Sequence, residues 1–180
     1  FGLTYLEFLS IRDPEELQQA QPHFLLSHDA QHLLPQQQVL YRVALRSDDI
    51  DATHHTLSQH GLALSPIVAG KRHDKQGNLI EWRIFTIGGD FDGVPYPFVL
   101  QWTTNDAARL DFLRSHQIDR PHPVGQTQLQ AAVFKVKQPQ RVAAHWQAVF
   151  QLPASEQTPT TLLIGDQQFI FQQGDENRLS

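Results

Sequence analysis

Residues 79–102 read LIEWRIFTIGGDFDGVPYPFVLQW, two apolar runs separated by Gly, Asp and Pro. Branched and aromatic residues favour strands, and the residues between them favour a loop. Because side chains alternate between the faces of a strand, the first run divides into two sets. The apolar set is Ile80, Trp82 and Ile84, and the mixed set is Glu81, Arg83 and Phe85. We expect the apolar set to meet helices, and the mixed set, with Gln101 on the next strand, to line a concave, partly polar cup.

The same order of elements continues on both sides of this stretch. Val39–Arg46 predicts a strand, and Ser47–Asp49 offers oxygens that cap a helix after it. Residues 129–172 repeat the order, with a strand, a helix that begins at Pro139, and a hairpin that turns at Gly165 and Asp166. The repetition predicts an α+β fold of tandem βαβββ modules, in which a curved, cup-like mixed sheet has helices on its outside.

Three modules follow from this repetition. Residues 1–38 are interpreted as the end of a truncated first module plus a connection, 39–120 as the second module with its closing helix, and 121–180 as a third, shorter module. The chain contains no Met and opens with the strand pattern Leu3–Ile11, so we expect the beginning of the first module to be missing. The Gln- and His-rich stretch 20–38 is expected to be an irregular connection with surface histidines.

Composition narrows the class of partner. The net charge is −5 and 40% of the residues are hydrophobic, which is typical of a globular protein and argues against nucleic acid as a partner. No apolar run approaches the roughly 20 residues of a membrane span. The absence of Cys excludes disulfides and thiolate sites and agrees with a cytoplasmic location. We expect a small-molecule ligand, and a homodimer that covers the open sheet edges.

Several separated runs resemble one known family. They are YLEFLSI at 5–11, GNLIEWR at 77–83, PFVLQW at 97–102 and PHPVG at 121–125. In this order they are similar to the glyoxalase-like branch of the vicinal oxygen chelate superfamily, which includes glyoxalases, bleomycin resistance proteins and dioxygenases. The resemblance implies paired modules that curl into a cup, with a divalent metal (Zn, Mn, Ni or Fe) held by His or Glu on the first and last strand of each module.

The resemblance carries over to individual positions unevenly. Glu7 matches the last-strand Glu of the first module, where it would serve as metal ligand or catalytic base. The equivalent last-strand position holds Gln101, and the first-strand positions hold Arg42 and Ala131. A neutral amide, a guanidinium and a methyl group are poor ligands. The implied metal site is therefore degenerate, and Glu7 would bind metal only if a preceding segment supplied further ligands.

Cationic and polar residues near the expected cup suggest a different use. An Arg in a partly apolar cup can bind a carboxylate or phosphate through two hydrogen bonds. The candidate substrate-binding residues are Arg42, Arg72, Arg83, Gln101 and His122. Each Arg could instead be an exposed surface charge or the partner in an ion pair, for example Arg42 with Glu7. His122 could instead serve only to shape the crossover connection.

Two functions remain open at this stage. One is an enzyme, a lyase or oxidoreductase of glyoxalase or dioxygenase type, acting on a small oxygen-rich anion. The other is a non-catalytic protein that sequesters a small molecule, as resistance proteins of the superfamily do. Turnover of a bound ligand separates the two.

Overall fold

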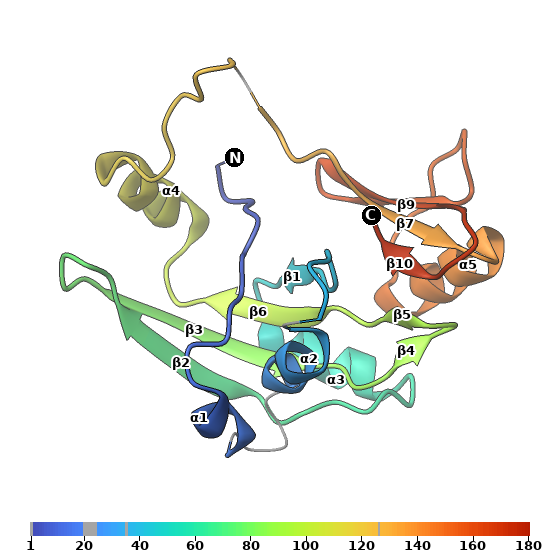
Figure 1. The fold of residues 1–180 in the computed structure, drawn as a ribbon. Helices are drawn as coiled ribbons and strands as arrows, with labels where there is room; N and C mark the ends of the chain where they lie inside the picture. Colours follow the sequence, from blue (N-terminus) through green and yellow to red (C-terminus); the bar gives the residue numbers. More distant parts are fainter. Residues whose placement is uncertain (1, 20–24, 35, 126) are drawn as a thin grey trace.

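The structure is a computed structural model that describes residues 2–19, 25–34, 36–125 and 127–180 (Figure 1). Within these residues the helices are α1 Pro14–Gln18, α2 Leu25–Leu33, α3 Ile50–Ser58, α4 Asp106–Ser115 and α5 Pro139–Phe150. The strands are β1 Ala44–Arg46, β2 Val68–His73, β3 Leu79–Thr86, β4 Asp90–Phe91, β5 Val94–Pro95, β6 Phe98–Trp102, β7 Ala131–Val136, β8 Thr161–Ile164, β9 Gln167–Gln173 and β10 Arg178–Leu179.

Two four-stranded sheets, both mixed, organise the molecule. The first has the order β1-β6-β3-β2, in which β1 runs parallel to β6 and the other pairs are antiparallel. The second has the order β10-β7-β9-β8, in which β7 and β9 are parallel. The hairpin β4-β5 lies between β3 and β6 along the chain. Each sheet is built from a strand, a helix and further strands, so the predicted α+β class is confirmed.

The predicted capping residue of α3 is found in the structure, and α4 begins in the same way. The Asp49 side chain accepts a hydrogen bond of 3.0 Å from the Ala52 amide at the start of α3. Asn105 does the same for Ala108 in α4, at 2.9 Å. These oxygens satisfy amides that have no partner within the helix. Pro139 occupies the first turn of α5, where its missing amide hydrogen costs nothing.

The core has two parts that meet at α5. Trp146 of α5 is fully buried and packs near the stacked rings of Phe134 and Phe171 in the second sheet. A second cluster joins α3 to the first sheet, and Val149 of α5 belongs to it, as does Phe85 of β3. The two sheets with their helices are therefore held together by shared apolar contacts.

The first eleven residues differ from expectation. Leu3–Ile11 was predicted to be a strand, but it forms none, because no described strand pairs with its backbone. It crosses in front of the first sheet (Figure 1). Its large apolar side chains remain exposed, with Phe8 at 90%. A sequence that favours a strand still needs a neighbouring strand to form hydrogen bonds with its backbone amides and carbonyls. The prediction rested on composition and did not include such a partner.

Two further predictions need correction. The expected irregular connection 20–38 contains the helix α2. Within it His28 is half-buried and His32 exposed, while His23 lies outside the described residues. The stretch 70–78, whose polar and basic composition predicts a turn, begins as a strand instead, because β2 stays paired with β3 as far as His73 opposite Leu79. Alternate apolar side chains are therefore not required for a strand at the edge of a sheet.

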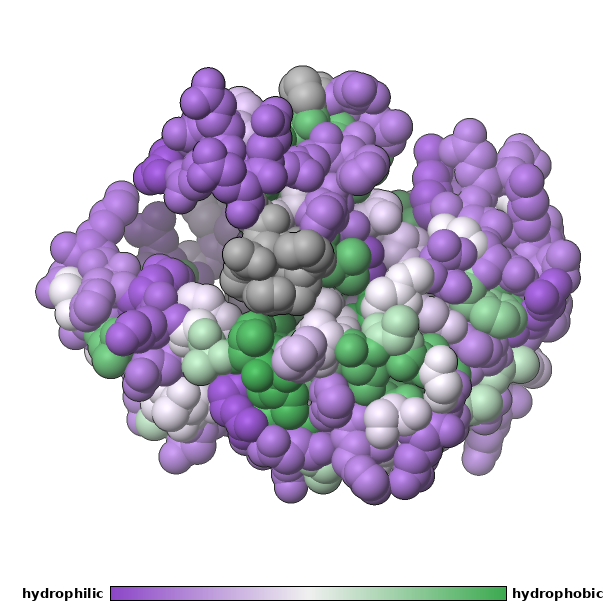
Figure 2. All heavy atoms as spheres, turned by 90° about the horizontal axis from the view of Figure 1, so that it is seen from below, coloured by the Kyte–Doolittle hydropathy of each residue, from purple (hydrophilic) through white to green (hydrophobic). Residues whose placement is uncertain are grey.

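The surface in the view of Figure 2 is mostly hydrophilic. Figure 2 shows apolar side chains gathered in the middle of the lower face and surrounded by hydrophilic ones. In the described part of the chain, no helix has the length and apolar character needed to cross a membrane.

Candidate functional site

The first sheet has two different faces, which the strand register defines. Trp82 of β3 lies opposite Gly70 of β2 and Trp102 of β6. Directly opposed residues share a face, so these three lie in one row, on what we call the Trp82 face. Arg83 and Gln101 are also opposed and lie on the other face, against α3. Figure 1 shows the N-terminal segment and α2 in front of the sheet and α3 behind it.

Arg83 and Gln101 bind α3 rather than line a cup. The Arg83 guanidinium donates hydrogen bonds of 2.6 and 2.8 Å to the two carboxylate oxygens of Asp51. The Gln101 amide donates to the Asp48 carbonyl at 2.6 Å and accepts from the Ile50 amide at 3.2 Å. The mixed set of side chains therefore lies on the face that α3 covers and not in an open cup, while the apolar set meets α2 through Leu25 and Leu26 on the other face.

Arg42 is buried in an ion pair with α2. Its side chain is 6% exposed, and its Nε lies 2.8 Å from Oδ2 of Asp29. Its Nη2 donates to Oδ1 of the same carboxylate at 3.1 Å, and its Nη1 donates to the Tyr96 carbonyl. The partner considered from the sequence, Glu7, is exposed. Asp29 replaces it because α2 brings a carboxylate over the sheet.

The remaining predicted residues are exposed. Glu7 lies on the unpaired N-terminal segment, and Arg72 lies on β2 opposite Ile80, on the Trp82 face. His122 accepts a hydrogen bond of 3.3 Å from the Val124 amide, within a turn closed by a bridge to Gly125. Of the predicted binding residues, Arg72 alone combines exposure with a position on the Trp82 face.

The structure adds Arg109, which the sequence reasoning missed. Its guanidinium lies 3.6 Å from the centroid of the Trp102 ring. Its Nε is buried without a hydrogen-bond partner, and no carboxylate in the described residues pairs with it. The nearby Asp106 pairs instead with Arg46, at 3.0 Å. Arg109 follows Trp102 closely in the sequence, but the contact forms only because α4 lies against the end of β6, which no local pattern predicts.

Burial and neighbours set the electrostatics around Arg109. Desolvation lowers the pKa of Arg109 from its ordinary value; Tyr5 and Asp106 act in the opposite direction, and Arg72 adds to the lowering. Arginine stays charged at neutral pH despite this. The pKa of the Tyr5 hydroxyl is raised by desolvation and by Glu7, although the residue is 46% exposed. Stacking on the Trp102 ring removes water from the guanidinium but does not neutralise its charge. Such a cation is suited to attract an anion.

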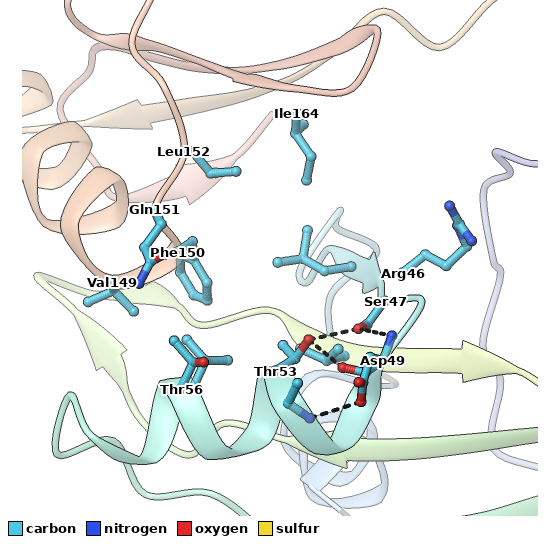
Figure 3. A pocket seen from close by; sticks show the side chains of 14 residues that line it. Arg46, Ser47, Asp49, Thr53, Thr56, Val149, Phe150, Gln151, Leu152 and Ile164 are labelled. Atoms are coloured by element: carbon cyan, nitrogen blue, oxygen red, sulfur yellow. Dashed lines mark hydrogen bonds between the residues drawn. The ribbon is translucent and has the colours of Figure 1, made fainter.

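A separate cavity of about 400 Å³ lies between α3 on one side and the C-terminal end of α5 with β8 on the other. Figure 3 shows its apolar side, formed by Val149, Phe150, Leu152 and Ile164, facing α3. Its charged and hydroxyl groups are largely committed to the fold: Ser47 bonds Thr53 at 2.7 Å, and Asp49 caps α3. This cavity offers no uncommitted charge, whereas the Trp82 face offers Arg109.

Comparison with known families decides the classification. The family model described as a glyoxalase-like domain matches residues 1–150. The chain belongs to the glyoxalase-like domain family. Glyoxalase-like domains are part of the vicinal oxygen chelate superfamily, so the resemblance noted in the sequence is confirmed.

One solved structure supports the fold of this glyoxalase-like chain. It is described as a crystal structure of a hypothetical protein from Staphylococcus aureus, and it is 19% identical with a TM-score of 0.63. The likeness covers 76% of this chain and 54% of that protein, so the glyoxalase-like chain spans about half of its length. At this identity the comparison concerns the fold alone. The search of curated proteins found no match.

The metal implied for glyoxalase-like proteins does not fit the residues of this face. On the Trp82 face, β1 presents Ala44 and Arg46, and β6 presents Phe98, Leu100 and Trp102. These side chains are apolar or cationic, whereas divalent metals need carboxylate or imidazole ligands. Among the described residues no three His, Asp or Glu side chains are grouped closely enough to bind a metal ion.

Proposed function

We propose that this glyoxalase-like protein binds a small organic anion on the Trp82 face, with Arg109 as its charged anchor. The observation that carries the proposal is the Arg109 guanidinium, which stacks on Trp102 at 3.6 Å and has no carboxylate partner in the described residues. A guanidinium stacked in this way keeps its charge and its in-plane hydrogens for an incoming carboxylate.

The pairing of the other arginines supports the choice of Arg109. Seven arginines form ion pairs with carboxylates: Arg12, Arg42, Arg46, Arg83, Arg114, Arg141 and Arg178. Within the described residues, three arginines have no ion pair: Arg72, Arg109 and Arg120. Arg72 and Arg120 are exposed, and Arg109 is half-buried. Leaving a desolvated cation unpaired costs free energy, which a bound anion recovers.

Binding without turnover agrees better with this face than superfamily chemistry does. The implied reactions use a metal that chelates two adjacent substrate oxygens, and the strand positions facing the ligand carry Arg46, Leu100 and Trp102 instead of ligands. An anchor and aromatic walls are sufficient to sequester a molecule. We therefore propose a role as a binding protein, like that of the non-catalytic, resistance-type members.

Calorimetric titration with benzoate tests the proposal. A charge-assisted hydrogen bond contributes about 1.5–3 kcal/mol, so Arg109→Gln should weaken binding about 10- to 150-fold. Arg109→Lys keeps the charge but loses the planar stack and should fall between the two proteins. The matched control is Arg120→Gln, which removes an exposed arginine that also lacks an ion pair. Equal affinity in the wild type and Arg109→Gln would refute the proposal.

A further inference from the structure

A second cavity opens on the Trp82 face beneath α2. It has a volume of about 290 Å³ and is bounded by the start of α2 on one side and by β2 and β3 on the other. Its lining is mainly apolar: Leu25, Leu26, Val68, Trp82 and Ile84. No Asp, Glu, Lys, Arg or His of the described residues lines it. This cavity suits an apolar group and disfavours a phosphate or a sugar.

Trp82 connects this cavity to the Arg109 site. Its ring borders the cavity and also lies 6.0 Å from the Trp102 ring, on which Arg109 stacks. Gly70 makes room for this position, because a Cβ there would lie 2.4 Å from the Trp82 ring. The cation and the apolar cavity therefore border the same pair of tryptophans.

The roof of the cavity is fixed to the segment that leads into β1. Asp29, on the same helix as Leu25 and Leu26, forms the buried ion pair with Arg42 at 2.8 Å. A helix held in this way keeps the cavity open at low entropic cost when a ligand enters. The pair that the fold uses for stability thus also shapes the space beneath α2.

We propose that the ligand is an amphipathic organic anion. Its carboxylate pairs with Arg109, and its apolar chain or ring passes Trp82 into the cavity beneath α2. This inference rests on the proposed function for the anionic group and adds the class of the ligand body. The affinity then grows with buried apolar area, since each buried methylene contributes about a fourfold gain.

Titration with straight-chain carboxylates from acetate to decanoate tests the class. On the unmodified protein, affinity should rise about fourfold per methylene and level off once the cavity is filled. Leu26→Trp fills the cavity and should flatten this series while acetate affinity stays the same. Leu33→Trp, on the same helix but outside the cavity lining, is the matched control and should keep the slope.

The outcomes separate this inference from the function beneath it. A series with no dependence on chain length, while Arg109→Gln still weakens acetate binding, overturns the amphipathic ligand and leaves the anion anchor standing. Equal acetate affinity in Arg109→Gln and wild type overturns both. The same slope in Leu26→Trp as in Leu33→Trp places the chain elsewhere and also overturns the inference.

Discussion

Replacement of Asp29 by Asn tests whether a buried ion pair holds α2 on the sheet. The Arg42 and Asp29 side chains are 6% and 14% exposed, with 2.8 Å between Nε and Oδ2. Neutralising Asp29 leaves the Arg42 charge buried without its counter-ion, which costs about 3–5 kcal/mol. Unfolding entropy is about 2.1 cal/mol/K per residue. For a chain of 180 residues, Tm should therefore fall by about 8–13 °C.

The chain contains a matched pair that serves as the control. Arg83 and Asp51 form the same two-pronged contact, with hydrogen bonds of 2.6 and 2.8 Å. Their side chains are 43% and 65% exposed, so water and salt screen the interaction. Asp51→Asn should leave Tm nearly unchanged. Thermal unfolding followed by circular dichroism, at equal protein concentration and ionic strength, compares the two variants directly.

Two results would refute the reasoning. If Asp29→Asn lowers Tm no more than Asp51→Asn does, burial does not decide what such a pair contributes. The double variant Arg42→Met with Asp29→Leu removes both charges at once and should be more stable than Asp29→Asn alone. A double variant that is less stable would mean that the unpaired charge is not the source of the loss.

Two further changes test packing and pH dependence. Gly70→Ala places a Cβ 2.4 Å from the Trp82 ring, so it should lower the free energy of unfolding by about 1–3 kcal/mol and alter the tryptophan fluorescence. In the control Gly88→Ala the nearest atom to the new Cβ would be 3.4 Å away, so neither the stability nor the fluorescence should change. Desolvation lowers the pKa of His145, whose Nε2 lies 2.6 Å from the Tyr96 hydroxyl. Its neutral form is favoured in the folded state, so stability should be full above about pH 6.5 and fall below it; the slope of Tm against pH should become shallower in His145→Gln.

The sequence was sufficient to predict the structure wherever it depends only on adjacent residues. The cap at Asp49, the Pro139 start of α5 and the turn at Gly165 each depend on a few adjacent residues, and all are found in the structure. The order of strand, helix and strands follows from them. Capping and turn geometry need no distant partner, which is why they could be predicted.

The two faces of β3 could not be assigned from alternation. The period of two separates Trp82 from Arg83, but it does not say which set the helix covers. The structure places Phe85 fully buried against α3, and Arg83 on the same face reaches Asp51 at the rim of that helix. A long side chain can therefore share a buried face by carrying its charge to the edge.

Distant partners explain the remaining differences. The helix α2 lies within the Gln- and His-rich stretch 20–38, and its Asp29 pairs with Arg42, which comes shortly before β1. Leu3–Ile11 has strand composition but no described strand beside it. Arg109 looks like an ordinary helix-surface residue until α4 turns back over Trp102. In each case the outcome depends on a partner in another secondary-structure element, or on the lack of one among the described residues.

The arginines near the first sheet are stabilised in two different ways. Arg42 and Arg83 are neutralised by carboxylates, and both tie helices to the first sheet. Arg109 is stabilised by a ring, which compensates for lost water without cancelling the charge. The positive charge of Arg109 therefore remains available to an anion on the Trp82 face, which also holds the apolar cavity. A residue placed only for stability would be expected to pair with Asp106, one turn away on the same helix, yet that carboxylate pairs with Arg46.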